Sequence, residues 1–385
     1  MKILLIWPYF YPEHGAAAVR GNAFARYLKQ ENIQIEVIAP IKKDLRVKKK
    51  YNYKENDVDI PVYRLPLIFD TKDVFVLLQS FLKLETLIKK INPNLILSSS
   101  TPSTVTWQSA LLSKKLKIPF IMDVRDPYAS SLRSTSNKPL IHKLASYVET
   151  QSLKQATLVF PVTPHLKNLL IKEYQISENK IKIVPNGFDF QNINVSKNNK
   201  ENDIVFIGSL TNLGRNTDNI LNILKNIKLN LPNISIKIVG CKNKENIEKL
   251  FIENQLQKNV ILKEPIDHLK IPNELAYSKI GLIVINQNSN FEYQIPTKTY
   301  EYLAVGLTIC ALGPSNGALK KFIEKNQIGF YSDKQSELIN KMIDLIENKK
   351  LWEKMHSNAL KTSKAYHRKN IVKNALNNYI RPLLE

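Results

Sequence analysis

Short apolar runs alternate regularly with helical patterns along this chain, and few folds accommodate such an order. At the N-terminus an apolar run at Lys2–Trp7 precedes a helical pattern at Ala16–Lys29 and a second run at Ile33–Ile38. Strand, helix and strand in this order form a βαβ unit, in which the two strands lie parallel. Further runs follow at Leu95–Ser98, Phe120–Val124, Thr157–Val162, Ile204–Ile207, Ile234–Val239, Ile280–Ile285 and, as the last clear strand, Thr308–Leu312. The sequence therefore predicts an α/β protein with parallel sheets.

Length and one polar segment divide the chain into domains. At 385 residues it suits two domains, each large enough to bury a core. Asn-Gly at 186–187 follows the apolar run Ile181–Val184 and indicates a tight turn, and the polar residues after it resemble a linker. We expect a first domain over residues 1–188, a linker over 189–202, a second domain over 203–365 and a C-terminal helix over 366–385.

Composition favours a globular protein that remains in the cytoplasm. Hydrophobic residues make up 43% and charged residues 23% of the chain, which is ordinary for a folded domain. No apolar run reaches the roughly 18 to 20 residues of a membrane helix, and the N-terminus begins with a strand-like run instead of a cleavable signal. Cys241 and Cys310 lack metal-ligand spacing, so we expect two unpaired structural thiols.

A formal net charge of +22 predicts a polyanionic neighbour, which could be nucleic acid, an anionic membrane face or a phosphorylated substrate. Part of the excess could equally reflect the codon usage of an AT-rich genome. A basic run at residues 42–54 is either a solvated loop or a membrane-docking segment, in which each cation contributes about 1 kcal/mol. The lysines assigned to docking are Lys42, Lys43, Lys48, Lys49 and Lys50. Elsewhere the charge is spread out, which disfavours nucleic acid.

The stretch Asn290–Gly306 carries the clearest functional signal. It follows the apolar run Ile280–Ile285, and Pro296 and Gly306 suit the start and the end of a helix. A helix N-terminus attracts phosphate, and Lys298 would add a full positive charge there. Glu301, three residues on, lies on a neighbouring face and suits a sugar diol, since an ionised carboxylate accepts hydrogen bonds at both oxygens. A nucleoside diphosphate offers both groups; the alternative is an ordinary helix with a solvated Lys/Glu pair.

The sequence P-T-K-T-Y-E-Y-L-A-V-G in this stretch resembles the start of the donor-binding helix in the retaining glycosyltransferases of family 4. Those enzymes have the GT-B fold, in which two Rossmann-like domains face each other across a cleft and a C-terminal helix returns to the first domain. The resemblance implies that Glu301 binds the ribose of a donor nucleotide, and that Tyr293 occupies the place of the first glutamate of a Glu-x7-Glu motif. P-N-G-F-D at 185–189 resembles the sequence motif that marks the interdomain link of the family, and D-V-R-D at 123–126 resembles a motif of its bacterial polysaccharide enzymes.

The resemblance also implies a donor site. A loop at Gly15 would face the donor phosphates, with Arg20 as a further candidate, while Arg215 would hold the diphosphate and Ile266 would lie near the base. The expected donor-binding residues are Gly15, Gly208, Ser209, Arg215, Ile266, Tyr293, Thr297, Lys298 and Glu301.

Four residues are expected to carry catalysis: Arg125, Asp126, Arg215 and Lys298. Arg125 and Asp126 stand where other members have a histidine, and could neutralise phosphate and orient a hydroxyl. Arg215 and Lys298 would supply the positive charge that a metal supplies in metal-dependent transferases, so neither a metal nor another cofactor is expected.

The function implied is transfer of a hexose or N-acetylhexosamine from a nucleotide diphosphate sugar to a hydroxyl of a glycan or lipid-linked acceptor, with retention. The implied setting is capsule or O-antigen synthesis, with the protein peripheral at the inner face of the cell membrane. No carboxylate pair suited to hydrolysis stands out, which argues against a glycosidase. Two alternatives remain: a nucleotide-sugar epimerase on the same fold and, less readily, a basic nucleic-acid-binding protein.

Overall fold

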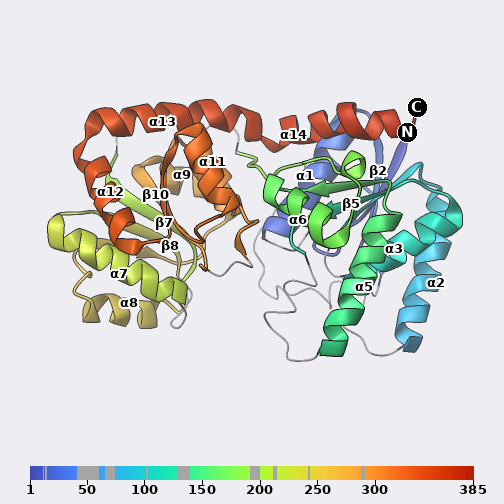
Figure 1. Ribbon diagram of the computed structural model, residues 1–385, viewed down its shortest axis with the longest axis horizontal. Helices are drawn as coiled ribbons and strands as arrows, with labels where there is room; N and C mark the ends of the chain where they lie inside the picture. The colour runs from blue at the N-terminus through green and yellow to red at the C-terminus, as the bar shows by residue number, and fades with distance from the viewer. Residues whose placement is uncertain are drawn as a thin grey trace. The chain divides into compact units, whose positions relative to one another are not determined.

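The computed structural model of the protein consists of two compact units, each built on its own parallel sheet (Figure 1). The first unit comprises Met1–Asn186 and Arg368–Glu385, and the second comprises Gly187–His367. The structure describes residues 1–11, 13, 15–40, 60–65, 74–100, 103–127, 139–190, 200–210, 215–241, 243–287 and 291–385. The basic run at 42–54 and most of the expected linker lie outside these residues.

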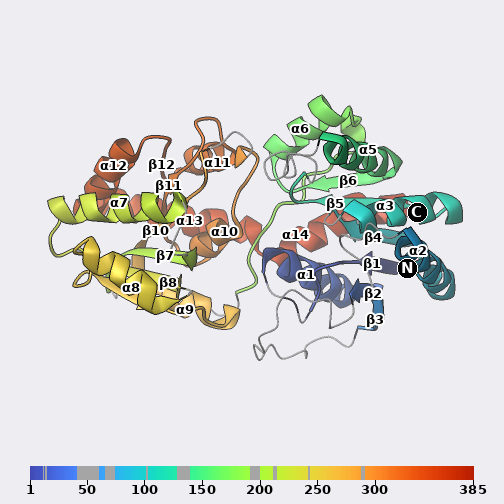
Figure 2. The same cartoon turned by 90° about the horizontal axis from the view of Figure 1, so that it is seen from below.

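In the first unit six strands pair in parallel in the order β3-β2-β1-β4-β5-β6 (Figure 2). Their bounds are β1 Lys2–Ile6, β2 Gln34–Pro40, β3 Val62–Leu65, β4 Leu95–Ser99, β5 Phe120–Val124 and β6 Leu158–Pro161. The central strands β1, β4 and β5 are mostly apolar because helices cover both faces of the sheet. Those helices are α1 Ala16–Gln30, α2 Val74–Ile91, α3 Ser103–Leu116, α5 Pro139–Gln155, α6 Pro164–Tyr174 and α14 Arg368–Ala375. Strand β3 was not predicted, since V-Y-R-L at this sheet edge is only half-buried and forms no apolar run.

The second unit repeats this plan with the order β12-β11-β10-β7-β8-β9 (Figure 2). Its strands are β7 Asn202–Leu210, β8 Ile236–Cys241, β9 Val260–Lys263, β10 Ser278–Val284, β11 Thr308–Leu312 and β12 Gly329–Ser332. The edge strand β12 follows the last strand that the sequence predicted. The helices are α7 Arg215–Asn230, α8 Lys244–Glu253, α9 Ile271–Ala276, α10 Thr297–Ala304, α11 Ala318–Asn326, α12 Gln335–Glu347 and α13 Lys349–Ser363.

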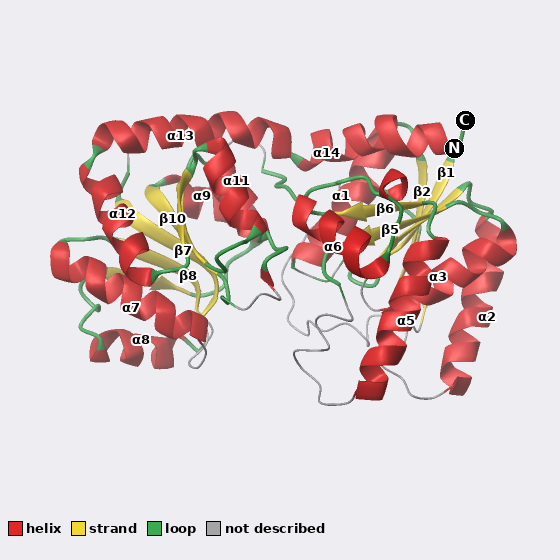
Figure 3. Ribbon diagram, in the orientation of Figure 1, coloured by secondary structure: helices red, strands yellow, loops and turns green. Residues whose placement is uncertain are grey.

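Helices cover both faces of the second sheet (Figure 3), and the sheet separates two apolar clusters of buried side chains. One cluster joins the strands to α7, α8 and α12, and the other joins them to α10 and α11. Different helices cover the two faces because the strand order reverses at β7. The chain first passes from β7 to β8 and β9, then returns past β7 to β10. Right-handed crossovers in these two directions place their helices on opposite faces of the sheet. Cys241 and Cys310 are buried and unpaired, as predicted, and burial raises the pKa of both thiols, to about 11 and about 12.

The C-terminal residues pack on the first unit. Helix α14 lies against α1, with Lys373 Nζ 3.2 Å from Glu31 Oε1, and the ring of Tyr379 lies 6.0 Å from that of Phe160. The predicted class, two Rossmann-like domains with a C-terminal helix on the first, is therefore confirmed. In the part of the chain that the structure describes, no helix has the length and apolar character needed to cross a membrane.

Candidate functional site

The strand order of the second unit places a switch point at its centre. The chain passes from β7 outward to β8 and β9, then crosses to β10 on the other side of β7. The helices after β7 and β10 lie on opposite faces, and open α/β sheets bind ligands at the carboxyl ends of two such strands. Gly208 lies near the carboxyl end of β7, and α10 begins shortly after β10. The sequence stretch with the clearest signal therefore lies where this fold binds ligands.

The end of β7 has a conformation that depends on glycine. Gly208 has a φ of +144°, and the pairing of β7 with β8 shifts register between Ile207 and Leu210. A Cβ added at Gly208 would lie 2.9 Å from Nζ of Lys298, and one added at Gly240 in β8 would lie 2.4 Å from the carbonyl oxygen of Gly208. The two glycines thus leave room for a lysine ammonium beside the strand end.

Helix α10 begins as predicted. Pro296 precedes it with φ −58° and ψ 144°, no described side chain caps it, and Gly306 follows its end with a φ of +70°. Its first N–H groups have no intrahelical carbonyl partner, so they carry partial positive charge. Thr297, half-buried, is the first residue of this helix. The start of α10 therefore favours an anion.

Lys298 brings its ammonium to the same place. Nζ lies 4.2 Å from the centre of the Phe206 ring, a cation–π contact, and close to Gly208. Burial of the ammonium lowers the pKa of Lys298 to about 8, although the negative charge of Glu301 opposes the change. Lys298 as a residue is half-buried, and an ammonium that loses solvent with so little compensation favours an anionic ligand. The charge of Lys298 and the N-terminus of α10 together make a site suited to phosphate.

Glu301 lies beside this phosphate site and is held by a residue that the sequence did not single out. Glu301 is 7% exposed, and its Oε1 lies 3.0 Å from Nε2 of His268. The ring of His268 in turn lies 5.6 Å from that of Phe190. His268 was missed because its partner is 33 residues away, a separation that leaves no periodic signal in the sequence.

The remaining donor-site predictions of the second unit are placed as follows. The side chain of Tyr293 is mostly covered, at 7% exposure, and Ile266 is half-buried against the cluster that includes α10. Ser209 lies in β7 and Arg215 is the first residue of α7, but their side chains are outside the described part of the chain. The structure thus brings Gly208, Thr297, Lys298 and Glu301 together, and the donor-binding roles of all eight residues stay predictions.

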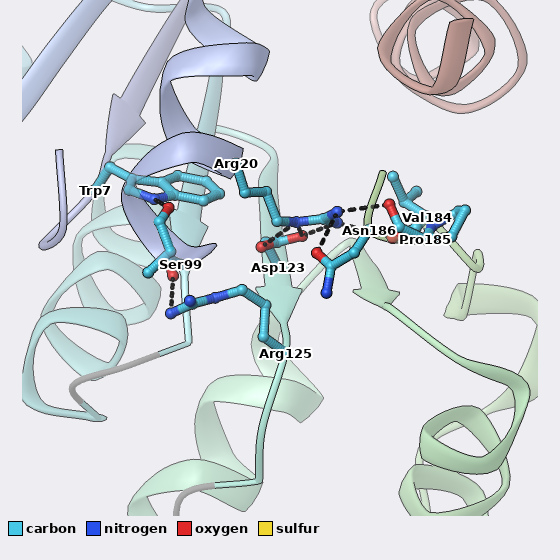
Figure 4. A network of polar contacts seen from close by, with 9 residues as sticks. Trp7, Arg20, Ser99, Asp123, Arg125, Val184, Pro185 and Asn186 are labelled. Atoms are coloured by element: carbon cyan, nitrogen blue, oxygen red, sulfur yellow. Dashed lines mark hydrogen bonds and ion pairs between the residues drawn. The ribbon is translucent and has the colours of Figure 1, made fainter. Parts of the chain in front are cut away.

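In the first unit the predicted residues lie in the segments that follow β1 and β5. Gly15 is exposed, has a φ of +105° and directly precedes α1. Arg125 follows β5, and its guanidinium donates to Oγ of Ser99 at 3.3 Å (Figure 4). Burial lowers the pKa of Arg125, while the charges of Asp123 and Asp126 oppose the shift. Its Nε is buried without a hydrogen-bond partner among the described residues, which leaves one donor of the guanidinium unpaired there.

The suggestion that Arg20 helps to bind donor phosphates is wrong. Arg20 is 3% exposed, and its guanidinium pairs with Asp123, the shortest contact being 2.6 Å (Figure 4). The remaining N–H groups donate to the carbonyls of Val184 and Pro185 at 2.9 and 2.8 Å and to Oδ1 of Asn186 at 3.4 Å. All five donors are thus used within the first unit. Arg20 fixes the segment that leaves this unit and is not a ligand-binding group.

Two known families match the chain in succession. Glycosyltransferase Family 4 matches residues 19–192, and Glycosyl transferases group 1 matches residues 188–362. An uncharacterized glycosyltransferase of Methanocaldococcus jannaschii is 24% identical over 226 residues, which are 54% of this chain. The match spans 55% of the length of that relative.

Several solved structures share the whole fold. A glycosyltransferase of Rickettsia africae has a TM-score of 0.71 at 18% identity, over 99% of this chain and 98% of that one. Anabaena HepE, solved in complex with UDP, has a TM-score of 0.70 at 15% identity, over 99% and 100%. A protein of Listeria monocytogenes, provisionally assigned as a UDP-N-acetylglucosamine 2-epimerase, has a TM-score of 0.64 at 14% identity, over 99% and 97%. The two family matches together span residues 19–362, and the chain belongs to the glycosyltransferases of the GT-B fold, with a family 4 domain followed by a group 1 domain.

Proposed function

We propose that the protein transfers a hexose or N-acetylhexosamine from a nucleoside diphosphate sugar to a hydroxyl of a glycan or lipid-linked acceptor. The observation that carries the proposal is the pairing of Lys298 and Glu301 at the switch point of the second sheet. Lys298, near the start of α10, places its ammonium against Gly208 of β7. The carboxylate of Glu301 is close enough for its charge to affect the pKa of Lys298. A diphosphate and a ribose, which are adjacent in every such donor, fit this arrangement of one cation and one hydrogen-bond acceptor.

In the proposed mechanism the second domain stabilises the leaving group. As the glycosidic bond breaks, negative charge grows on the diphosphate, and Lys298 and the N–H groups at the start of α10 hold that charge. Arg215 at the start of α7 would add a second cation, and the two cations would make a metal unnecessary. Because these groups are fixed by the fold, they need not reorganise when the charge develops. The reaction would proceed with retention, as in the family that the sequence resembles.

The first domain is proposed to serve the sugar and the acceptor. The Nε of Arg125 has no hydrogen-bond partner among the described residues, so we assign Arg125 to a phosphate oxygen and Asp126 beside it to an acceptor hydroxyl. The D-V-R-D word at 123–126 supports a setting in surface polysaccharide synthesis, capsule or O-antigen, at the inner face of the cell membrane. There the lysines of residues 42–54 would bind anionic lipid.

A thermal-shift panel tests the donor site. The full-length protein is heated with UDP-, GDP-, ADP-, TDP- and CMP-sugars, and a donor that binds the folded state raises the apparent melting temperature. UDP-sugars come first, since HepE binds UDP on the same fold. The absence of any shift would refute the donor site. Product analysis with the best donor then separates the functions, because an epimerase releases an altered sugar without an acceptor whereas a transferase requires one.

A substitution tests the role of Glu301. Glu301→Ala should weaken donor binding about tenfold or more and leave the protein folded, because it removes hydrogen bonds to a charged acceptor. Glu337→Ala is a matched control, since Glu337 also accepts a hydrogen bond, from Ser332 Oγ at 2.8 Å, but on α12. Equal donor affinity in the two variants would mean that Glu301 does not hold the ribose.

A further inference from the structure

His268 touches the carboxylate that is proposed to bind ribose. It opens a short helical turn, His268–Lys270, after β9, whereas Glu301 lies in α10. The distance from Nε2 to Oε1 is 3.0 Å, and the two side chains are 24% and 9% exposed. An ionised carboxylate can only accept hydrogen bonds, so the imidazole N–H is the donor. The contact ties together two elements that are distant in sequence.

This hydrogen bond fixes the orientation of the carboxylate. A glutamate side chain has several accessible rotamers, and a carboxylate that is free to rotate loses entropy when it binds a ligand. Oε1 is engaged by His268, and among the described residues Oε2 has no hydrogen-bond partner, so its acceptor positions suit a diol. The ring of Phe190 lies 5.6 Å from the imidazole, packs on His268 and limits the movement of the histidine side chain. Phe190, His268 and Glu301 thus form a chain in which each side chain restrains the next.

We propose that His268 is a positioning residue, which holds Glu301 in the orientation that recognises the ribose hydroxyls. The inference rests on the proposed function, because it requires that Glu301 bind the ribose. His268 lies two residues after Ile266, which we predict to lie near the base. One short segment would then contact the base directly and control the ribose through Glu301. Selection of ribonucleotides over deoxyribonucleotides therefore depends on His268.

Two substitutions separate the hydrogen bond from the packing. His268→Phe keeps an aromatic ring against Phe190 and removes the donor, whereas His268→Gln keeps an N–H donor at similar reach and removes the ring. Loss of positioning should affect only the contacts that Glu301 makes. We expect His268→Phe to lower the ribose preference about tenfold, from the usual strength of a hydrogen bond to a charged group. We expect His268→Gln to retain the preference.

Calorimetric titration of the full-length protein provides the test. The probes are UDP, GDP and ADP, each beside its 2′-deoxy and 3′-deoxy counterparts, and the tightest set is used for wild type, His268→Phe, His268→Gln and Glu301→Gln. The measured quantity is the ratio of the deoxy and ribo dissociation constants. A general loss of folding would weaken both forms alike and leave this ratio unchanged, whereas loss of positioning lowers it.

The outcomes distinguish the inference from the function on which it rests. A ratio that falls in Glu301→Gln and in His268→Phe but persists in His268→Gln supports the inference. A ratio that falls in Glu301→Gln and stays at the wild-type value in His268→Phe overturns the role of His268 and leaves the role of Glu301 intact. A wild-type ratio in Glu301→Gln refutes ribose binding by that carboxylate, and with it the inference.

Discussion

Binding of a nucleoside diphosphate should depend on the titration of Lys298. In the free protein the pKa of this side chain is about 8, lowered from 10.5 by burial. Below pH 8 the ammonium is charged before and after binding, so its titration does not affect affinity. Above pH 8 the free protein loses the proton, and a bound diphosphate, which stabilises the ammonium, must restore it. Affinity should therefore fall as pH rises through about 8.

The size of this effect follows from the pKa shift. If a diphosphate restored the ordinary pKa of 10.5 in full, affinity would fall by up to about tenfold per pH unit above pH 8, and by about 300-fold at most. At pH 8 about half of the free protein carries the proton, so binding should take up about half a proton per site. Calorimetric titrations between pH 7 and 9.5, in buffers with different ionisation enthalpies, measure both the affinity and the proton uptake.

Lys200 offers a matched control for Lys298. Burial also lowers the pKa of Lys200 to about 8, and its Nζ donates to the carbonyl of Ala276 at 2.6 Å. Lys200 precedes the first residue of β7, whereas Gly208 lies near the other end of this strand. Lys298→Met should weaken binding at pH 7 and abolish its pH dependence, whereas Lys200→Met should change neither. An affinity that is constant from pH 7 to 9.5 in the wild type, or a pH dependence that survives in Lys298→Met, would refute the reasoning.

Three further substitutions test the framework of the site. Gly208→Ala places a Cβ 2.9 Å from Nζ of Lys298 at a φ of +144°, so we expect about 1 to 3 kcal/mol lower stability in urea and weaker diphosphate binding. Arg20→Met leaves the carboxylate of Asp123, which is 0% exposed, without its partner, and should cost about 3 to 5 kcal/mol in urea unfolding; Asp123→Leu in addition should restore most of this. Tyr302→Phe removes the hydroxyl that accepts a buried N–H of β7 at 3.0 Å and should lower stability by about 1 to 3 kcal/mol; an unchanged urea midpoint would contradict that role.

The fold was predictable because parallel strands that are buried on both faces consist of runs of mostly apolar residues. The central strands are covered on both faces, so almost every residue must be apolar, and the sequence shows this directly. Edge strands β3 and β12 are half-buried and mix polar with apolar residues. Their position depends on pairing with a neighbouring strand, which a local pattern does not reveal.

The candidate site was predictable only where its residues are close in sequence. Lys298 and Glu301 lie three residues apart on one helix, so their proximity followed from helical geometry. The partner of Glu301 and the partner of Arg20 are 33 and 103 residues away. A cation near a glycine loop resembles an anion-binding group in sequence, and only the fold shows that Asp123 already occupies Arg20.

The first unit is discontinuous in sequence, since Arg368–Glu385 complete it after the whole of the second unit has been made. Residues Ile371, Val372 and Leu376 of this segment are buried, so the first unit lacks part of its core until residues 368–385 have been made. The second unit, Gly187–His367, is continuous and can fold earlier. Truncation of the chain before residue 368 would therefore damage the unit to which residues 1–186 belong, although the second unit would keep all of its residues.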